Sequence, residues 1–597
     1  MKTNFIVTLI FIIAFCSCKK EVKDDTIQAK LPPIDTIFSN YYETYLKFYP
    51  LKATESGDNR YNDQLKINIS NTFKTKVWVF NMRYRDTLEM YDDRKLTEAE
   101  KLSKSVLSWE IMQSLEEHKF KTELMPINQM YSLPLTMGQM GSGSGSQPFN
   151  NYTDYTNWLN RLEKFAVWCD SASVNLQKGV KKGYVLPRSL VKKIIPQLED
   201  LAKPVTEENL FYTPVTKMPE TLTEREKKLV KETYTAVLEL KVIPSLENLI
   251  QYIKTDYLEA GRTSSGIDII PEGKEYYNYL LRYYTTTAMT ADQIHELGLK
   301  EVERISNEML KVKEEVGFEG DLKEFFNAIR SKKELMPFTA PEQVIENFTE
   351  IHERIKPNLK KLFDKTPKTG FEVRRTEAFR EASASAEYNP GSLDGTRNGI
   401  FYVPIPNVKN YNTFSDEDLF LHEAIPGHHY QISLQQENEN LPDFRKTLWY
   451  SAYGEGWALY AESLGKELGL YQDPYQYFGM LSAEMHRAIR LVVDTGLHSK
   501  GWTREQAIQY SLDHEAEGEE SIIAEIERYM AIPGQALSYK VGQLKILELR
   551  KFVENNLGDK FKIKEFHNKI LSYGCIPLEL LEEKIKNWVS SQNKISL

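Results

Sequence analysis

The chain has 597 residues, a formal net charge of −9 at pH 7, 41% hydrophobic residues and 12% aromatic residues. This content of apolar side chains is sufficient for a large buried core, and the length permits one large domain or several. The charge excess is mild and no long basic run occurs, so the composition argues against nucleic acid as a partner.

The N-terminus has the features of a secretion signal. One lysine precedes an apolar run at residues 5–15, which is too short to cross the hydrocarbon core of a bilayer. The following Ser17-Cys18 is typical of the cleavage and lipid-attachment site of bacterial lipoproteins, with an ordinary signal peptide as the alternative. We therefore predict a signal peptide at 1–17, acylation of Cys18 and a tether at 18–36. Lipid alone would then anchor the protein in the cell envelope, at the outer membrane.

Only two cysteines remain in the predicted mature chain, Cys169 and Cys575. They cannot build a disulfide framework or a Cys-x-x-Cys metal site. One long-range disulfide and two buried free thiols are both compatible with this count, and the free thiols are the simpler prediction.

Helical periodicity dominates the rest of the chain. Thr290 starts a capping box with Gln293 three residues later, and Pro244 predicts a kink or break in a long helical segment. Strand-like stretches are scarce, and the best are residues 267–270 and 399–404. The segments with helical periodicity are 152–178, 224–253, 290–317, 341–362 and 543–556.

These segments predict a mainly α protein of roughly 60–70% helix with one small β-sheet. The only low-complexity stretch, the Gly/Ser-rich residues 141–146, predicts a mobile loop before the helix at 152–178. No repeat of fixed period occurs. Residues 37–597 are therefore predicted as a single helical domain.

The most informative stretch is residues 422–429, HEAIPGHH, which nearly matches the zinc-peptidase motif His-Glu-x-x-His. In that motif, two histidines four residues apart share one helical face and hold the metal, and the glutamate beside the first histidine activates water. Here Pro426 stands where the second histidine belongs, and His428 and His429 follow six and seven residues after His422. The residue types are those of a zinc site, but the spacing differs.

Pro426 predicts a distortion of the helix that begins near Ser415. Proline cannot donate a backbone hydrogen bond to the carbonyl of His422, and its ring crowds that carbonyl. On an unbroken helix, His422 and His429 would lie two turns, roughly 10 Å, apart. A distortion that absorbs two residues would place His428 where the second histidine normally lies. We predict His428 as the ligand, and keep His429 as the alternative ligand or as a group that supports a ligand or contacts substrate.

A third ligand is predicted in the helical segment at 453–462, where Glu455 and Glu462 share one face. A catalytic zinc site needs three protein ligands and one open position. Glu455 follows His428 by 27 residues, and a glutamate from a second helix at such a distance completes the site in one large class of zinc peptidases. Glu462 would then hold a histidine ring. The alternative is that both glutamates are ordinary surface carboxylates.

The order of several motifs resembles a known family. They are GYVLPR at 183–188, YNP at 388–390, the histidine run, EGW at 455–457, RLVVDTGLH at 490–498 and PGQALSYK at 533–540. By these motifs the chain is identified as a member of the bacterial family catalogued as domain of unknown function 885, which includes many lipoproteins. The resemblance covers nearly the whole mature chain.

That family is similar to the glutamate-zincin metallopeptidases, whose folds are largely helical with a deep substrate cleft between two lobes. The resemblance therefore implies a large, two-lobed, zincin-like peptidase fold, with lobes at roughly 37–290 and 291–597. The lengthened histidine motif is the point at which this chain departs from those peptidases.

The same resemblance implies roles for later residues. In glutamate zincins, tyrosines and a histidine beyond the glutamate helix stabilise the oxyanion formed when water attacks the peptide carbonyl. The matching candidates are Tyr539, Tyr529 and His498, with core packing as the alternative for each. Asp494 is a candidate for orienting His498 through a carboxylate–imidazole hydrogen bond.

Three further residues are candidates for substrate binding. Arg397 and Arg528 could each bind a substrate carboxylate through a bidentate fork, with a buried ion pair as the alternative. Tyr388, in the YNP motif, is the third candidate.

Taken as a set, these residues predict a zinc-dependent metallopeptidase that acts on peptides. His422, His428 and Glu455 would bind Zn²⁺, and Glu423 would act as the general base on the metal-activated water. The alternatives are a zinc-dependent amidase or other hydrolase, a non-catalytic peptide-binding lipoprotein, and a structural metal site. Glu423 beside His422 argues against a binding module, because binding needs no general base. No oligomeric state is predicted.

Overall fold

The computed structural model describes residues 31–143, 145–377, 381, 384–393, 395 and 397–595. The predicted signal peptide, Cys18 and most of the tether lie outside these residues. Within the described part of the chain, no helix is both long and apolar enough to span a membrane.

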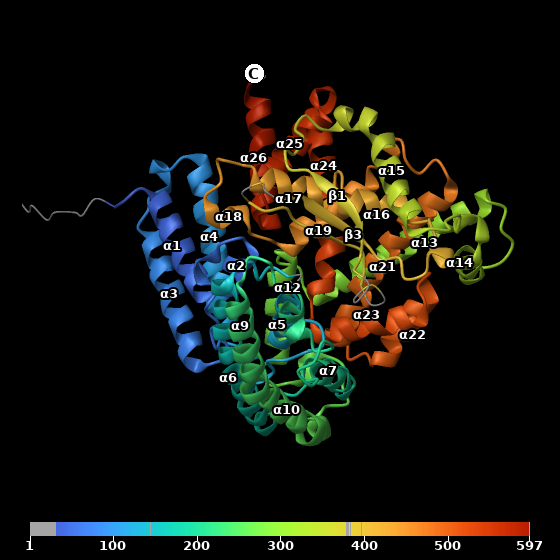
Figure 1. The fold of residues 1–597 in the computed structure, drawn as a ribbon. Helices are drawn as coiled ribbons and strands as arrows, with labels where there is room; N and C mark the ends of the chain where they lie inside the picture. Colours follow the sequence, from blue (N-terminus) through green and yellow to red (C-terminus); the bar gives the residue numbers. More distant parts are fainter. Residues whose placement is uncertain are drawn as a thin grey trace, which may run out of the picture.

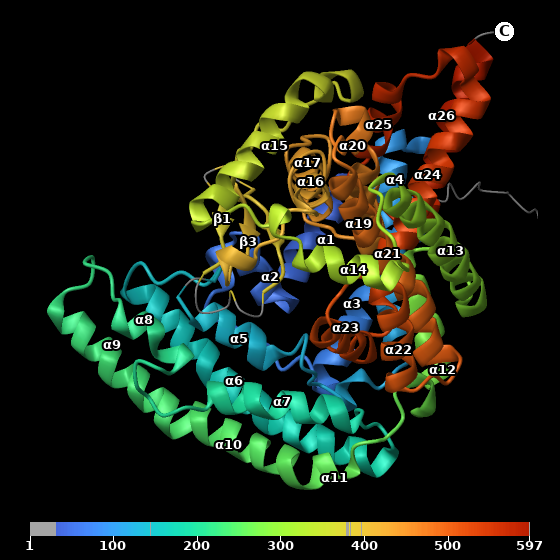
Figure 2. The ribbon, with the colours of Figure 1, turned by 90° about the vertical axis from the view of Figure 1, so that its right-hand side faces the viewer.

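The fold is mainly helical and two-lobed, with 70% helix and 3% strand, which confirms the predicted fold class. The N-terminal helices stand together at one side of the molecule (Figure 1). They are α1 (Ile34–Phe48), α2 (Pro50–Glu55), α3 (Asn71–Glu89) and α4 (Glu98–Glu117). The next helices form a layer of their own at the bottom of Figure 2. They are α5 (Leu133–Gly141), α6 (Tyr152–Lys182), α7 (Arg188–Leu201), α8 (Thr213–Thr216), α9 (Glu224–Val237), α10 (Ile243–Tyr252) and α11 (Leu258–Ala260).

The remainder of the chain forms the body that contains the histidine run. Its first helices are α12 (Gly273–Thr285), α13 (Ala291–Glu315), α14 (Leu322–Ser331) and α15 (Pro341–Leu362). The small sheet and then the shorter helices follow: α16 (Asp416–Glu423), α17 (His428–Gln436), α18 (Asp443–Lys446), α19 (Ser451–Ser463) and α20 (Gly465–Leu468). The C-terminal helices are α21 (Pro474–Ser499), α22 (Arg504–His514), α23 (Glu519–Ala531), α24 (Ser538–Leu557), α25 (Ile563–Ser572) and α26 (Leu578–Ile595).

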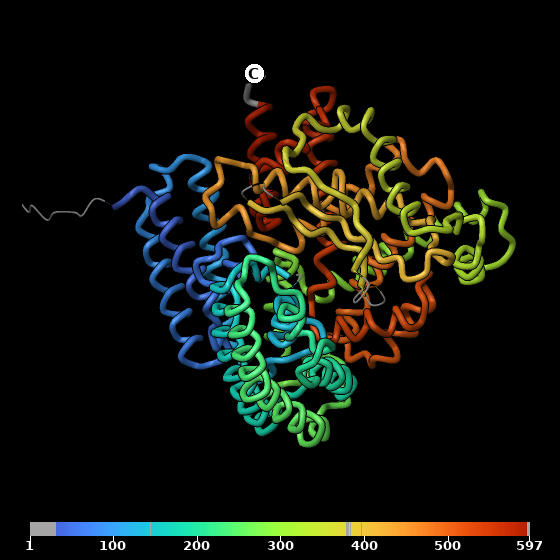
Figure 3. Tube along the Cα trace, viewed as in Figure 1, coloured from blue at the N-terminus to red at the C-terminus, as the bar shows by residue number. Residues whose placement is uncertain are grey.

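The buried apolar side chains form two large clusters. One lies within residues 65–257 and includes the α6 side chains Trp158 and Phe165. The other joins buried residues of the N-terminal helices, up to Ile111, to those of residues 302–589, with Leu190 added from α7. The tube in Figure 3 shows the blue N-terminal helices at the side of this orange and red body. Helices α1, α3 and α4 therefore share a core with the C-terminal part, across the boundary predicted near residue 290.

The sheet has three strands in the order β1-β3-β2. They are β1 (Phe371–Arg375), β2 (Glu387–Asn389) and β3 (Gly399–Val403). Strand β3 pairs in parallel with β1 and antiparallel with β2, and all five of its residues are buried. Figure 1 shows the sheet beside α15 and α16. The predicted strand at 399–404 is thus confirmed, as the central strand.

Local signals predicted several helices well. Helix α15 has the predicted bounds, and α13 begins after Thr290, whose side chain accepts from the Gln293 backbone while Gln293 returns the bond. The long segment 224–253 is interrupted by a π-helical turn at Leu238–Val242, directly before α10, whose first turn contains Pro244. Cys169 and Cys575 are buried free thiols, as predicted.

The strand predicted at 267–270 is wrong, because Ile267–Ile269 forms a 3₁₀ turn. Its backbone is bound to a side chain instead of a neighbouring strand: Ile267 N–H donates to His498 Nδ1 at 3.0 Å. His498 lies 231 residues away in the sequence, so no local sequence pattern predicts this hydrogen bond.

Two glycines let α19 and α24 approach closely. A Cβ on Gly456 would lie 2.5 Å from Cα of Gly542, and a Cβ on Gly542 would lie 1.9 Å from the carbonyl oxygen of Ala452. Neither position has room for a side chain, because backbone atoms cannot move aside as a flexible side chain can. This contact fixes the helix that carries Glu455 against the helix that carries Tyr539.

The contact predicts a stability change. Gly456→Ala should lower the free energy of unfolding by about 1–3 kcal/mol, because the added methyl group forces the two helices apart. Urea denaturation measures this change. Gly518→Ala is the matched control, since nothing lies within 4 Å of a Cβ at that position. Equal stabilities for the two variants would contradict the proposed tight contact.

Candidate metal centre

The histidine run is divided between two helices. Helix α16 starts with the acidic residues Asp416, Glu417 and Asp418, which suits the positive end of a helix dipole, and it ends at Glu423. Helix α17 starts at His428. The four residues between them break the helix, and the Ile425–Pro426 peptide bond is cis. The distortion predicted from Pro426 is therefore a complete interruption.

Glycine at position 427 is a requirement of this break. A Cβ there would lie 1.9 Å from the carbonyl oxygen of His422, so the chain passes directly over the end of α16. The indole Nε1 of Trp457 donates to the Pro426 carbonyl at 2.8 Å. Trp457 is a fully buried residue of α19, so the helix that carries Glu455 also holds the break in place.

Three side chains converge across the break. The Nε2 atoms of His422 and His428 lie 3.6 Å and 3.3 Å from Oε2 of Glu455, and one ligand atom from each residue lies within 4.8 Å of the other two. In a tetrahedral zinc site with bonds of about 2.0–2.1 Å, neighbouring ligand atoms are about 3.3–3.4 Å apart. These residues could therefore hold a metal ion, and their nitrogen and carboxylate donors suit zinc.

His429 points elsewhere. Its Nδ1 lies 2.9 Å from the Tyr388 hydroxyl and 3.3 Å from Oγ of Ser433, and its ring packs on Phe371 with centroids 4.7 Å apart. Burial lowers the pKa of His429 to about 4, so the ring is neutral at pH 7. The hydroxyl of Tyr388, a candidate for substrate contact, is therefore engaged by His429.

Glu462 holds the first histidine. Its Oε1 lies 2.6 Å from His422 Nδ1, and only 2% of the residue is exposed. A carboxylate at Nδ1 fixes the ring so that Nε2 faces Glu455, which is the support expected for a metal-binding histidine. The structure thus brings Glu462 to the position predicted for it.

The charges of the centre favour a cation. Burial lowers the pKa of His422, but hydrogen bonds with Glu455 and Glu462 outweigh burial and raise it to about 10. Burial likewise raises the pKa of Glu455, but the two histidines outweigh it and hold that pKa well below its usual range. Asp418 adds a further buried carboxyl, whose pKa is raised first by burial and then by Glu462. A divalent ion would offset this concentration of carboxylates.

Glu423, the predicted general base, is a buried carboxylate beside the first histidine. Its residue is 8% exposed, and its carboxylate has no hydrogen bond to any described residue. Burial raises its pKa, with the nearby Glu455 charge acting in the same direction. A carboxylate with a raised pKa and an unoccupied oxygen can accept a proton from water near neutral pH.

Tyr539 lies at the start of α24, close to the metal centre. The pKa of its hydroxyl is raised by burial first and then by the charge of Glu455. The side chain is partly exposed, and the guanidinium Cζ of Arg490 lies 4.6 Å from the ring centroid. Of the three oxyanion candidates, Tyr539 is the one that the structure brings next to Glu455.

The other two oxyanion candidates have different roles. The Tyr529 hydroxyl donates to Glu525 at 2.8 Å and accepts from Arg490 at 3.1 Å, in a residue only 2% exposed. His498 accepts from the Ile267 N–H at Nδ1, and its Nε2 lies 3.0 Å from the Tyr529 carbonyl oxygen. Both ring nitrogens of His498 are therefore engaged by backbone groups.

Asp494 does not orient His498. It accepts from the Tyr277 hydroxyl at 2.7 Å and from the Gly534 N–H at 3.0 Å. The prediction of a carboxylate–imidazole pair is therefore wrong, because the Asp494 carboxyl is bound to the turn that precedes α24.

The two arginine candidates differ in their surroundings. Arg397 is exposed, and the described contacts do not connect it with the centre. Arg528 is partly buried and donates to Glu525 at 3.2 Å and to Gln535 at 2.9 Å. It adjoins Tyr539, with which it interacts electrostatically.

Two residues near the centre were not predicted. Trp449 is 43% exposed, and its ring centroid lies 5.6 Å from that of His428. A Cβ on Gly454 would lie 2.1 Å from this indole, so the glycine before Glu455 makes room for Trp449. The indole therefore forms an exposed wall beside the candidate ligand His428.

The second residue is Arg487, on α21. Its guanidinium Cζ lies 6.0 Å from the Tyr539 ring centroid.

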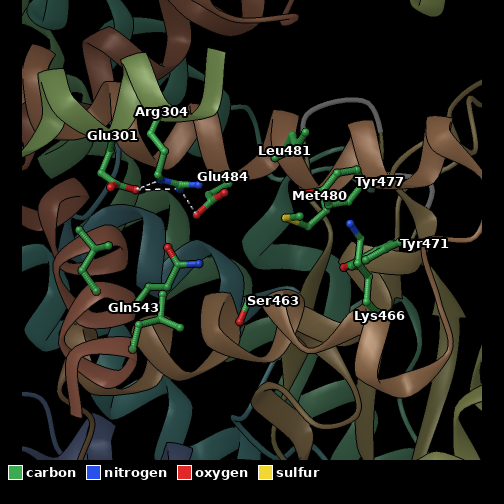
Figure 4. Close-up of a pocket in the computed structure, with 12 residues that line it drawn as sticks. Glu301, Arg304, Ser463, Lys466, Tyr471, Tyr477, Met480, Leu481, Glu484 and Gln543 are labelled. Carbon is green, nitrogen blue, oxygen red and sulfur yellow. Dashed lines mark hydrogen bonds and ion pairs between the residues drawn. The ribbon is translucent and has the colours of Figure 1, made fainter. Parts of the chain in front are cut away.

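A separate cavity of about 290 Å³ lies between α13, α19, α21 and α24. Figure 4 shows Arg304 paired with Glu301 and Glu484 on its wall. The fully buried Lys540 binds the same two glutamates at 2.9 Å and 2.7 Å. Its cations and carboxylates satisfy one another, which is the pattern of a structural ion network.

The chain belongs to the family described as bacterial protein of unknown function (DUF885), whose model matches residues 50–585. A solved protein of Colwellia psychrerythraea, assigned as a lipoprotein, superposes with a TM-score of 0.86 at 27% identity, over 94% of this chain and 99% of that one. A lipoprotein of unknown function from Shewanella oneidensis superposes with a TM-score of 0.74 at 19% identity, over 93% and 99%, which shows the shared fold. No curated protein matches the chain.

A Pyrococcus furiosus carboxypeptidase superposes with a TM-score of 0.31 at 12% identity, over 87% of this chain and 97% of that one. At this score the likeness carries no argument about the chain.

The geometry predicts which histidine binds metal. His428→Ala should weaken zinc binding by more than about 100-fold, beyond the effect of losing a group that only supports a ligand. His429→Ala should change the affinity less than about 10-fold, because its ring faces Tyr388. Competition with a chromophoric chelator measures the zinc dissociation constant of each variant. The reverse order of the two effects would rule out the assignment of His428.

Proposed function

We propose that the protein is a zinc-dependent metallopeptidase. The observation that carries the proposal is the convergence of His422, His428 and Glu455 at ligand spacing, beside a glutamate that binds none of the described residues. A structural zinc site has four protein ligands and no need of a free carboxylate. Three ligands with an adjacent base are the pattern of hydrolytic zinc sites.

The ligand residues would hold zinc, which when bound supplies Lewis acidity and lowers the pKa of a coordinated water to about 7. Glu462 keeps the Nε2 atom of His422 facing Glu455. Glu423 accepts the proton of the attacking water and passes it to the leaving amine.

Tyr539 would stabilise the oxyanion of the tetrahedral intermediate. The residue is partly exposed and interacts electrostatically with Glu455, and its raised pKa keeps the hydroxyl protonated at neutral pH. A donor aimed at this developing charge contributes roughly 3–4 kcal/mol to catalysis. The guanidinium of Arg490, 4.6 Å from the ring centroid, packs against the Tyr539 ring.

We also propose that the protein is a lipoprotein of the cell envelope, in which lipid on Cys18 is the only membrane anchor. The support is the signal-like N-terminal sequence and the lipoprotein assignment of the similar Colwellia protein. The protein would then encounter its peptide substrate in the cell envelope.

Glu423→Gln tests the mechanism. The variant should retain zinc, because residue 423 is not a ligand, and should lose about 10²–10⁴-fold in kcat, because the amide cannot accept the proton. Peptide hydrolysis and metal content are measured on the same preparation. Glu439→Gln, an exposed glutamate shortly after α17, is the control and should behave as the wild type.

Two outcomes would refute the proposal. The first is full activity of Glu423→Gln on a peptide that the wild type cleaves. The second is wild-type protein that contains no zinc and gains no hydrolytic activity when zinc is added. Hydrolysis of acyl amides or cell-wall amides in place of peptides would instead favour an amidase.

A further inference from the structure

Arg487 is a charged side chain without a charged partner. It lies on α21, directly after His486, and is partly buried. Its Nη1 donates only to the Ala483 carbonyl of its own helix, at 3.3 Å, and its Nε is buried without a partner. Among the described residues, no carboxylate oxygen lies within 4.0 Å of its guanidinium. A guanidinium withdrawn from water in this way normally has an anionic partner.

The neighbouring arginines increase the positive charge. Arg490 and Arg528 share one carboxylate, Glu525, at 2.9 Å and 3.2 Å. His486 has its own partner, Glu515, at 2.5 Å. Three guanidinium groups therefore lie around Tyr539, and among the described residues Glu525 is the one carboxylate that pairs with any of them at contact distance.

The acidic groups of the metal centre do not neutralise Arg487 by contact. Glu423 and Asp418 interact with it only through space, as the effect of Arg487 on their pKa values indicates. Asp418 has Ser415 as its hydrogen-bond partner, and Glu423 is the proposed general base. Among the described residues no carboxylate pairs with Arg487 at contact distance, so an anion that enters beside Tyr539 can pair with its guanidinium.

Arg487 is better suited to bind a ligand than its two neighbours. Arg490 is only 5% exposed and is bound to Tyr529 and Glu525. Arg528 is bound to Glu525 and Gln535. Arg487 has no such bonds, and a guanidinium binds a carboxylate through two parallel hydrogen bonds.

We propose that Arg487 binds the C-terminal carboxylate of the peptide substrate, so that the enzyme removes residues from the C-terminus. This inference rests on the proposed peptidase function. The Arg487 Cζ lies 6.0 Å from the ring of Tyr539, the proposed oxyanion donor. An extended peptide advances about 3.3–3.6 Å per residue, so this separation corresponds to a chain end within roughly two residues of the scissile bond. The released product is one amino acid or a dipeptide.

Three related peptides distinguish binding of the C-terminal carboxylate from binding of a side-chain carboxylate. The first has a free C-terminus, the second is amidated, and the third is amidated with glutamate as its last residue. The wild type should cleave the free acid with a kcat/KM at least about 30-fold above that of the amide, as expected for a charge pair formed away from water. The amidated glutamate peptide should resemble the plain amide.

Arg487→Met should remove this preference. Its kcat/KM for the free acid should fall to the level of the amide, while the amide is cleaved as by the wild type. Arg487→Lys, which keeps the charge but loses the fork, should retain part of the preference. Arg85→Met, an arginine of α3 paired only with its neighbour Asp86, is the control. Zinc content and thermal unfolding confirm that each variant is folded.

A binding measurement makes the test independent of turnover. In the Glu423→Gln background, titration calorimetry with the same peptides should show tighter binding of the free acid, and Arg487→Met should abolish the difference.

Three outcomes would overturn the inference. If the protein that retains Arg487 binds and cleaves the free acid and the amide equally well, the inference is wrong and the peptidase proposal is left intact. Equal losses on both peptides in Arg487→Met would overturn it in favour of a counter-ion role. Binding of the amidated glutamate peptide as tight as that of the free acid would overturn the C-terminal assignment.

Discussion

The interruption between α16 and α17 is the constraint on which the centre depends. Pro426 prevents the helix from continuing, and Gly427 is the residue that can pass over the carbonyl of His422. The Trp457 indole then binds the Pro426 carbonyl. Helices α16 and α17 are thereby held in an arrangement that brings His422 and His428 to the carboxylate of Glu455. A continuous helix with the same sequence would have separated these two rings.

The second level of organisation is electrostatic. Buried carboxylates on α16 and α19 gather around two histidines, and a cation shared among them would offset their negative charge. Around Tyr539, arginines of α21 and α23 share one contacting carboxylate, Glu525, and Arg487 pairs with none of the described carboxylates. A peptide that spans both regions would present its carbonyl to the metal and its anionic end to Arg487. The tight contact of α19 with α24 at Gly456 and Gly542 fixes the position of Glu455 relative to Tyr539.

The sequence was most informative where the physical cause was local. The capping box at Thr290, the helix at Pro341–Leu362 and the break at Pro426 each depend on a few adjacent residues, and each was predicted. The choice of His428 followed from the same local constraint. The turn at Ile267–Ile269 and the role of His498 depend on one hydrogen bond between residues 231 positions apart, so neither could be predicted from periodicity or motif. Trp449 and Arg487 were missed for a related reason, because only the folded chain brings them beside Glu455 and Tyr539.

The most direct test of the account is anomalous X-ray diffraction from crystals of the zinc-loaded protein, recorded on both sides of the zinc absorption edge. The account predicts one strong anomalous peak per chain, bonded to Nε2 of His422, Nε2 of His428 and a carboxylate oxygen of Glu455, at about 2.0–2.2 Å from each. A peak bonded to His429, or a centre without a peak in crystals that contain zinc elsewhere, would contradict it.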